Sequence, residues 1–387
     1  MKFSDRVSQL KPSLTLAITA KVKAMRKKGI DVIGFGAGEP DFDTPDNIKE
    51  AAIRAIKSGL TKYTPSAGTP ELREAVCEKL KKDNSLVYKP EEVVISCGAK
   101  HTLYNIFQAL CNKNDEVIII SPYWVSYPEM VALSGAKPRI VRSREEDGFV
   151  VDPGLIEKNI TGRTKAIIVN SPSNPTGAVY GKDVLKKIAE IAISRNIFVI
   201  SDEIYEKFTY GEERHVSLGA ILPEAKSHTI SVNGVSKAYS MTGWRIGYAA
   251  GDAQIIKLIS ALQSHSTSNP SSISQAAALE ALRGNQAAVL KMKKEFEVRR
   301  DYMVKRVNSS GKLSCVEPKG AFYIFCNISK TKLDSTAFAG QLLEKAHVAC
   351  VPGAAFGSDR HVRLSFATGM DNIKTGHDRI DKWLRTL

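Results

Sequence analysis

A lysine surrounded by small residues is the feature of the sequence that most strongly suggests covalent chemistry. Lys237 lies between Ser236 and Ala238, and Arg245 follows in the same segment, SVNGVSKAYSMTGWRIGYAAG. A lysine amine is a poor nucleophile while it is protonated, so a lysine that forms a Schiff base needs burial or a cationic neighbour to lower its pKa. Small neighbours would let a flat cofactor approach the backbone, and the arginine could pair with a phosphate. A surface lysine beside a structural arginine is the alternative interpretation of these two residues alone.

Two further polar clusters follow apolar runs that are typical of buried strands. Asp202 ends such a run in FVISDEIYE, and Tyr205 comes three residues later. Asn174 lies in SPSNPTG, a loop that its prolines and glycine keep out of helical conformation. Open α/β sheets bind ligands at the carboxyl ends of their strands, where a carboxylate could keep a pyridine nitrogen protonated. A turn or a helix cap is the alternative for each cluster.

Three more segments carry candidate binding groups. Gly98, Ala99 and Lys100 connect a strand to an amphipathic helix, and the free N–H groups at such a helix start favour a phosphate. Trp124 follows another buried run, where core packing is the common role of an aromatic residue. Arg363 lies inside the apolar run HVRLSFA, and a buried arginine requires an anion.

The elements that would position these residues form an alternating pattern. Apolar, β-branched runs recur between about residues 90 and 250, in EVVIS, DEVIIIS, KAIIVN, IFVISDE and TISVN, with amphipathic helical segments between them. This alternation predicts a mostly parallel sheet with helices on both faces. From about residue 285, a charged helix, the strand GAFYIF, a helix over 335–346 and HVRLSFA predict a smaller α+β domain, with which the first 35 or so residues pack. We therefore predict a large domain over 45–284 and a small domain formed by 1–44 and 285–387.

Composition excludes several classes of protein. The chain has 387 residues, of which 43% are hydrophobic and 25% charged, as in soluble globular proteins with large cores. No apolar run approaches the roughly 20 residues that cross a bilayer, and the N-terminus lacks a signal-peptide pattern, so we expect a cytoplasmic protein that does not bind membranes. The net charge of +14 is interleaved with acidic residues, which argues against nucleic-acid binding and favours small anionic substrates. The six cysteines form no C-x-x-C pair, which indicates free thiols rather than a metal site.

The full pattern around the lysine, GVSKAYSMTGWRIG, resembles the attachment-site signature of class I pyridoxal-phosphate-dependent aminotransferases at every defined position. The resemblance covers essentially the whole chain and is closest to the bacterial aspartate aminotransferase subgroup. It implies the aminotransferase-like α/β fold, also called PLP fold type I, with a mostly parallel seven-stranded sheet in the large domain. It also implies a homodimer with shared active sites.

The same resemblance implies a role for each residue that would hold pyridoxal 5'-phosphate. Lys237 would carry the cofactor, Asp202 would pair with its ring nitrogen, and Tyr205 would donate to its 3-oxygen. Trp124 would stack on the ring, and Asn174 would contact the 3-oxygen. The cofactor phosphate would be bound by residues that meet at a helix start, one of them from across the dimer interface: Gly98, Ala99, Lys100, Arg245 and Tyr63.

The implied reaction is transamination between L-aspartate or glutamate and 2-oxoglutarate or oxaloacetate. Arg363 would grip the substrate α-carboxylate, together with Asn174, Trp124 and the backbone of Gly38. The amine of Lys237 would move a proton between the substrate and the cofactor as a general acid–base.

The resemblance implies that one position, above all, determines which substrates are bound. Lys100, assisted by Ser13 and Thr15, would bind the distal carboxylate of a dicarboxylic substrate, although it could also be an ordinary first-turn helix residue. An aspartate/prephenate aminotransferase, or a class I enzyme of broader specificity, is the alternative function. A lyase, decarboxylase or acyltransferase of the same fold, and the sensor domain of a transcription regulator, fit the motifs less well.

Overall fold

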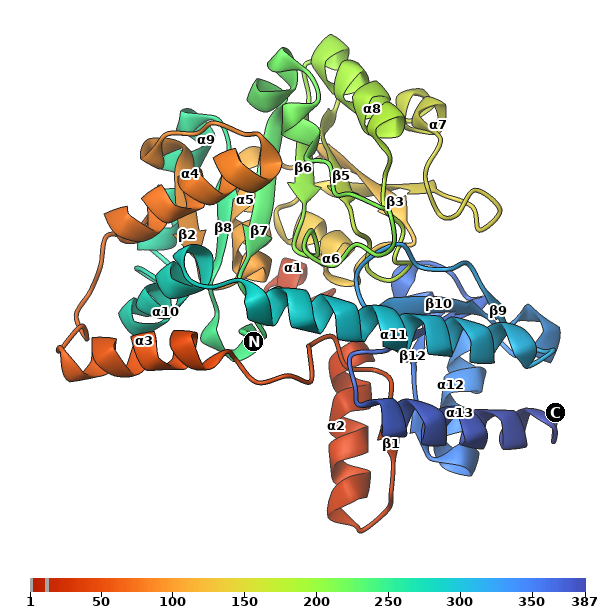
Figure 1. Ribbon diagram of the computed structural model, residues 1–387. Coiled ribbons are helices and arrows are strands. Elements are labelled where there is room, and N and C mark those ends of the chain that lie inside the picture. Colours follow the sequence, from red (N-terminus) through yellow and green to blue (C-terminus); the bar gives the residue numbers. More distant parts are fainter. Residues whose placement is uncertain (1–2, 11–13) are drawn as a thin grey trace.

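The computed structural model describes residues 3–10 and 14–387, and its central element is a seven-stranded sheet (Figure 1). Only one strand, β8, runs antiparallel to the others. In spatial order the strands are β2 (Val93–Ser96), β8 (Gly247–Ala250), β7 (Thr229–Gly234), β6 (Phe198–Asp202), β5 (Thr164–Asn170), β3 (Glu116–Ser121) and β4 (Lys137–Arg142). The predicted mostly parallel sheet is therefore confirmed.

Helices cover both faces of this sheet, because its inner strands are buried on both sides. On one face, apolar residues of α5 (Ala99–Leu110), α6 (Ser126–Leu133) and α9 (Ala253–Ser264) pack on the strands. The other face is covered by a second set of helices: α3 (Asp46–Lys57), α4 (Pro70–Asn84), α7 (Pro153–Lys158), α8 (Lys182–Arg195) and α10 (Ser272–Arg283). The sheet is thus the middle layer of three, with the carboxyl ends of its parallel strands at one edge.

A second group of strands lies beside the first and forms a smaller α+β unit. Four antiparallel strands occur in the order β12 (Val351–Pro352), β13 (His361–Ser365), β10 (Tyr323–Asn327) and β9 (Ser314–Cys315). Figure 1 shows the long helix α11 (Ala287–Ser309) running toward these strands, with α12 (Ser335–Ala346) and α13 (Met370–Leu384) beside them. Short 3-10 helices cover 90–92, 218–220, 223–228, 242–244, 329–331 and 353–356.

The N-terminal segment packs with this C-terminal unit. After α1 (Asp5–Ser8), α2 (Leu14–Lys27) leads to β1 (Ile33–Gly34), which pairs in parallel with β11 (Val348–Ala349). Apolar residues from both ends of the chain share one cluster, in which Val22 and Val32 meet Leu343. The domain boundaries at residues 44 and 284 stay a prediction.

β4 is among the strands that escaped the sequence pattern. β4 is an edge strand with the sequence KPRIVR, and most of its side chains are exposed or half-buried. Its proline and its charges are typical of an edge, where one side of the backbone needs no partner. Hydrophobic alternation therefore carried no signal for it.

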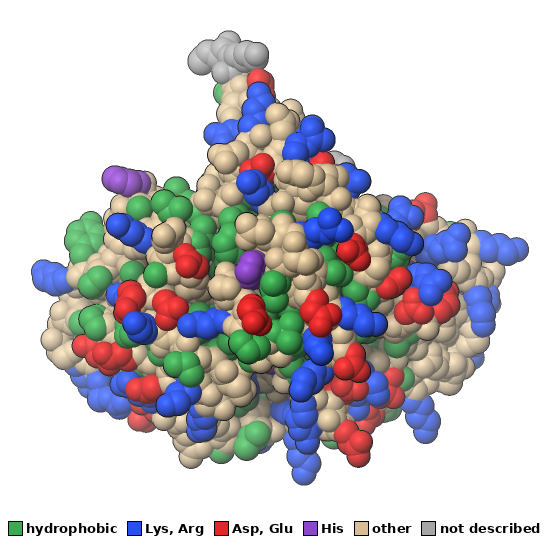
Figure 2. All heavy atoms as spheres, turned by 90° about the horizontal axis from the view of Figure 1, so that it is seen from above, with side chains coloured by type: hydrophobic (Ala, Val, Ile, Leu, Met, Phe, Trp, Pro, Cys, Tyr) green, Lys and Arg blue, Asp and Glu red, His purple; other side chains and the backbone are tan. Residues whose placement is uncertain are grey.

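The surface has mixed charge and the cysteines are free thiols. Figure 2 shows lysine and arginine side chains interspersed with acidic ones over the face that it presents. Among the helices of residues 3–10 and 14–387, none is long and apolar enough to span a bilayer.

Candidate active site

A cavity of about 390 Å³ lies at the carboxyl ends of the parallel strands, between the seven-stranded sheet and the smaller α+β unit. Its lining contains most of the residues that the sequence singled out, drawn from segments far apart in the chain. These are Gly38, Ala99, Lys100, Trp124, Asn174, Asp202, Tyr205, Lys237, Arg245 and Arg363. The fold therefore brings the predicted catalytic, cofactor-binding and substrate-binding groups to one place.

Lys237 comes from the turn that follows β7, and its amine points into the cavity. Its Nζ donates a hydrogen bond to the carbonyl oxygen of Gly38, at 2.6 Å. Burial lowers the pKa of Lys237 to about 8, because an ammonium loses hydration there. The lowered pKa therefore raises the fraction of this amine that is a free base near neutral pH, the form that Schiff-base chemistry requires.

Asp202 ends β6 and is almost fully buried, at 4% exposure. Tyr127 Oη donates to its Oδ2 at 2.6 Å, and the Ile204 backbone N–H donates to its Oδ1 at 3.3 Å. Burial nevertheless raises the pKa of Asp202 to about 6, since both bonds come from neutral donors and no cation pairs with the carboxylate in the described part of the chain. A protonated ring nitrogen would supply the missing charge.

Arg363 lies in the middle of β13 and is 2% exposed, and not all of its guanidinium N–H donors have a partner. Its Nη1 donates to Asn174 Oδ1 and its Nη2 to the Gly36 carbonyl oxygen, both at 2.9 Å. Its Nε is buried without a hydrogen-bond partner, and no acidic side chain within residues 3–10 and 14–387 pairs with it. Both of its bonds go to neutral oxygens, so a buried cation here is suited to an incoming carboxylate.

The phosphate-sized end of the cavity is formed by the start of α5 and by Arg245. Gly98 has φ +89°, and a Cβ there would lie 2.5 Å from Arg245 Nη2. Gly247 is equally constrained, since its Cβ would lie 2.1 Å from the Ala99 backbone nitrogen. Arg245 Nη1 donates to the Thr242 carbonyl oxygen at 2.8 Å, which fixes the guanidinium beside the helix N-terminus. Backbone N–H groups and a guanidinium thus converge, an arrangement that suits a phosphate.

Lys100 and Trp124 line the same cavity and contact each other. The Lys100 ammonium lies over the Trp124 ring, 4.9 Å from its centroid. Burial and the Arg245 cation lower the pKa of Lys100. The lysine is therefore a partly desolvated cation that an anionic ligand would stabilise.

Two of the predicted site residues, Gly98 and Tyr63, do not line this cavity. Gly98 lies beneath the phosphate-sized end without lining it, and Tyr63 is 90% exposed on the surface. Ser13 and the side chain of Thr15 lie outside the described residues.

Sequence analysis missed several polar residues that line the cavity, among them Thr19, Glu39, Tyr127 and Tyr323. Tyr127 holds Asp202, and Tyr323 Oη lies 2.8 Å from Tyr205 Oη. Tyr127 stands in the segment SPYWVSYPEM that drew attention to Trp124, but nothing in the sequence indicates that it reaches a residue 75 positions away.

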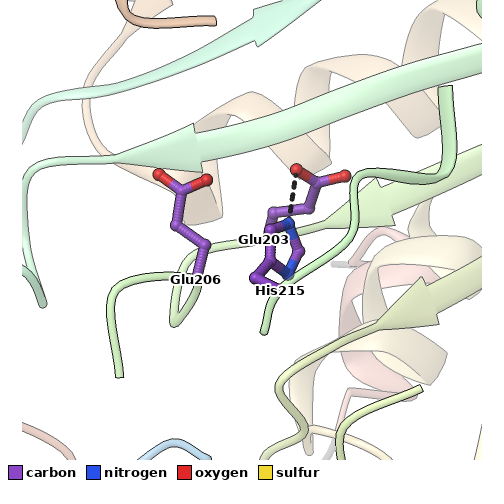
Figure 3. Close-up of side chains that lie close together, drawn as sticks. All are labelled: Glu203, Glu206 and His215. Carbon is purple, nitrogen blue, oxygen red and sulfur yellow. Dashed lines mark hydrogen bonds and ion pairs between the residues drawn. The ribbon is translucent and has the colours of Figure 1, made fainter. Parts of the chain in front are cut away.

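Figure 3 shows a largely buried cluster of charged side chains, Glu203, Glu206 and His215, of which the two glutamates directly follow Asp202 and Tyr205 in the sequence. One oxygen each of Glu203 and Glu206 and one ring nitrogen of His215 lie within 4.8 Å of one another, a spacing that a metal ion could use. However, Glu206 forms an ion pair with Lys79, and Asn84 Nδ2 donates to Glu206 Oε2 at 2.7 Å. Since protein cations and donors already satisfy these carboxylates, we assign the cluster to holding the turn that carries Tyr205 in place.

Fold and site together define a class of protein: the chain belongs to the family Aminotransferase class I and II, whose profile matches residues 30–380. It is 49% identical to the aspartate aminotransferase of Bacillus sp. (strain YM-2), with 99% of each chain covered. It is 51% identical to the probable aspartate/prephenate aminotransferase of Aquifex aeolicus (strain VF5), again over 99% of each chain. Among solved structures, the aspartate aminotransferase from Thermus thermophilus with maleate has a TM-score of 0.96, 46% identity and 99% coverage of both chains.

These matches confirm the predicted family and fold class. The family uses pyridoxal phosphate, and the cavity fits that cofactor on three counts. A lysine with a lowered pKa faces the cavity, a buried carboxylate lacks a cation, and a helix start with an arginine offers a phosphate site.

Proposed function

We propose that this protein is an aspartate aminotransferase, which moves an amino group between L-aspartate or glutamate and 2-oxoglutarate or oxaloacetate. The observation that carries the proposal is the convergence of Lys237, Asp202 and Arg363 on one cavity. The full-length similarity to proteins named aspartate aminotransferase supports the substrate.

In this proposal each residue around the cofactor has a separate role. Pyridoxal phosphate supplies an electron sink that stabilises the negative charge left at the substrate Cα. Asp202 keeps the ring nitrogen protonated, and Tyr205 donates to the 3-oxygen. Trp124 packs against the ring, while Arg245 and the start of α5 bind the phosphate.

The substrate is oriented by Arg363 and Asn174, which are already hydrogen-bonded to each other. Arg363 binds the α-carboxylate, with Gly38 nearby, and this fixes which bond at Cα stands perpendicular to the ring. Lys237 removes the Cα proton and returns it one position away, as a general acid–base. Its lowered pKa supports this role, because a group that titrates near the working pH both accepts and releases protons readily.

Lys100 is the proposed ligand of the distal carboxylate, and Ser13 and Thr15 are proposed to assist it. A second candidate, aspartate/prephenate aminotransferase, is favoured by the relatives that carry this name in Aquifex aeolicus and Thermus thermophilus. Both functions need a cation at the same place, so the structure of the cavity supports them equally.

We also propose a cytoplasmic homodimer with shared active sites. Tyr63 is 90% exposed, and Ile53, Ile56 and Leu60, which are close to it in the sequence, are exposed apolar residues too. Exposed apolar residues of this kind favour a protein partner, and a second copy would bring Tyr63 to the phosphate site of its neighbour.

The test is a substrate panel with the purified protein and added pyridoxal phosphate. Aspartate with 2-oxoglutarate should give oxaloacetate, and prephenate as acceptor distinguishes the second candidate. Lys237→Ala should lower turnover by roughly 10³-fold or more, because it removes both the attachment point and the proton carrier. Lys187→Ala, at an exposed position, is the matched control and should leave turnover unchanged. Normal activity in Lys237→Ala would exclude the proposed function.

A further inference from the structure

Two tyrosine hydroxyls inside the cavity share one hydrogen bond. Tyr205 Oη and Tyr323 Oη lie 2.8 Å apart, and both side chains are buried, at 4% and 0% exposure. Tyr205 comes from the turn after β6, whereas Tyr323 is the first residue of β10 in the smaller unit. Within the described part of the chain, neither hydroxyl has another hydrogen-bond partner.

The number of protons limits what this pair can do. Each hydroxyl has one proton, and the bond between them uses one of the two. The other proton can be donated only to an acceptor outside the pair. If Tyr323 is the donor within the pair, the Tyr205 proton is available to an outside acceptor; if Tyr205 is the donor, the Tyr323 proton is available instead.

Charge decides between the two directions. The proposed acceptor of Tyr205 is the 3-oxygen of the cofactor, and a hydrogen bond to an ionised oxygen is roughly twice as strong as one between neutral groups. The Arg363 guanidinium lies over the Tyr323 ring, 4.3 Å from its centroid. A cation on the ring face draws electron density from the phenol and makes its hydroxyl a better donor.

We infer that Tyr323 is a positioning residue for the cofactor. Its hydroxyl donates to Tyr205 Oη, so that Tyr205 donates its own proton to the cofactor's 3-oxygen. The inference rests on the proposed function, in particular on the role of Tyr205. It adds a chain of three groups, Arg363, Tyr323 and Tyr205, that joins the substrate-carboxylate side of the cavity to the cofactor side. The hydrogen bond from Tyr323 to Tyr205 and the proposed one from Tyr205 to the 3-oxygen would strengthen each other.

The test compares Tyr323→Phe, Tyr205→Phe and the double variant, each loaded with pyridoxal phosphate. Phenylalanine keeps the ring under Arg363 and removes only the hydroxyl. The measurement is the pH midpoint of the bound cofactor's absorbance, which reports the proton held between the Lys237 linkage and the 3-oxygen. Donation from Tyr205 draws electron density from that oxygen, so losing it lets the proton bind more tightly and moves the midpoint to higher pH.

We expect Tyr323→Phe to raise the midpoint by roughly 0.5 to 1 pH unit, as suits the loss of one buried hydrogen bond, and Tyr205→Phe to raise it further. The double variant should match Tyr205→Phe alone, because Tyr323 acts only through Tyr205. The affinity for maleate, an unreactive dicarboxylate, should stay within about threefold, since Arg363 keeps its hydrogen bonds.

Tyr210→Phe is the matched control. It removes an equally buried hydroxyl, which donates to the Ala321 carbonyl oxygen in the same apolar cluster but outside the cavity. Thermal unfolding of each variant establishes that it is folded. An unchanged midpoint in Tyr323→Phe, additive shifts in the double variant, or an equal shift in Tyr210→Phe would each overturn the inference. A wild-type protein that binds no pyridoxal phosphate would instead reject the proposed function.

Discussion

Lys237 Nζ and the carbonyl oxygen of Gly38 are joined by a 2.6 Å hydrogen bond, although 199 positions separate the two residues in the sequence. The bond ties the turn after β7 to the segment that follows β1. The acceptor of this amine is thus a neutral carbonyl group. A carboxylate at the same distance would stabilise the ammonium more strongly and offset more of the pKa lowering that burial causes.

Asp202 makes the cofactor-free protein sensitive to pH. Its folded pKa, about 6, exceeds the ordinary value of 3.8, so the folded state binds this proton more tightly than the unfolded state does. Stability from this group is therefore present below about pH 4 and is lost as the pH rises through about 6, by at most about 3 kcal/mol. Urea unfolding of the cofactor-free wild type and Asp202→Asn between pH 4.5 and 7.5 measures the difference. Asp202→Asn should gain relative stability as the pH rises, and a constant difference would contradict the assignment.

Lys100→Ala should change which substrates are used. If Lys100 pairs with a distal carboxylate, kcat/KM for aspartate should fall by roughly 30-fold or more, while that for alanine stays within about threefold. Lys113→Ala, at an exposed position just after α5, serves as the control. An equal loss for aspartate and alanine would show that Lys100 serves the cofactor and not the substrate side chain.

Gly98→Ala should weaken cofactor binding. A Cβ at this position meets the end of the Arg245 side chain and must push it away from the helix start, and the residue also has φ +89°. Both effects weaken binding of the cofactor's phosphate group, so the Kd for pyridoxal phosphate should rise by roughly tenfold or more. Gly162→Ala is the control, because a Cβ there meets no atom within 4 Å. Fluorescence titration gives both constants, and equal affinities would remove Gly98 from the phosphate site.

His215 should stabilise the protein only while it is protonated. Burial opposes its charge, but the Glu203 carboxylate at 3.0 Å outweighs this and raises the pKa of His215 above its ordinary value of 6.5. The added stability is therefore complete below about pH 6.5 and disappears as the pH rises through the folded pKa.

Unfolding of His215→Gln measures this contribution, which should be roughly 1 to 3 kcal/mol at low pH. The difference from wild type should shrink as the pH rises. His265→Gln, on the surface, should show no such trend. A difference that grows with pH would mean that neutral His215 is the stabilising form.

The sequence predicted those parts of the site whose signal is local. Asp202 and Asn174 come at or shortly after the ends of apolar strands, so hydrophobic patterning placed them at one edge of the sheet, whereas Lys237 was found from its small neighbours and the family signature. Arg363 was found because a charged residue inside an apolar strand is unusual. Each of these residues lies in a segment whose pattern can be interpreted without knowing the tertiary structure.

The residues that were missed act through distant contacts. Tyr127 reaches Asp202 across 75 positions, and Tyr323 reaches Tyr205 across 118. A tyrosine in an apolar run is typical core, and only the packing of the two units reveals that its hydroxyl meets a polar partner. Tyr63 differs from these residues: the sequence predicted a role for it, but that role needs a second chain.

The position of β13 has a consequence for how the site is assembled during translation. Arg363 leaves the ribosome after Lys237 and after every strand of the seven-stranded sheet. During synthesis the chain therefore contains the lysine before it contains the guanidinium that is proposed to recognise substrates. The proposed substrate site stays incomplete until β13 has been made.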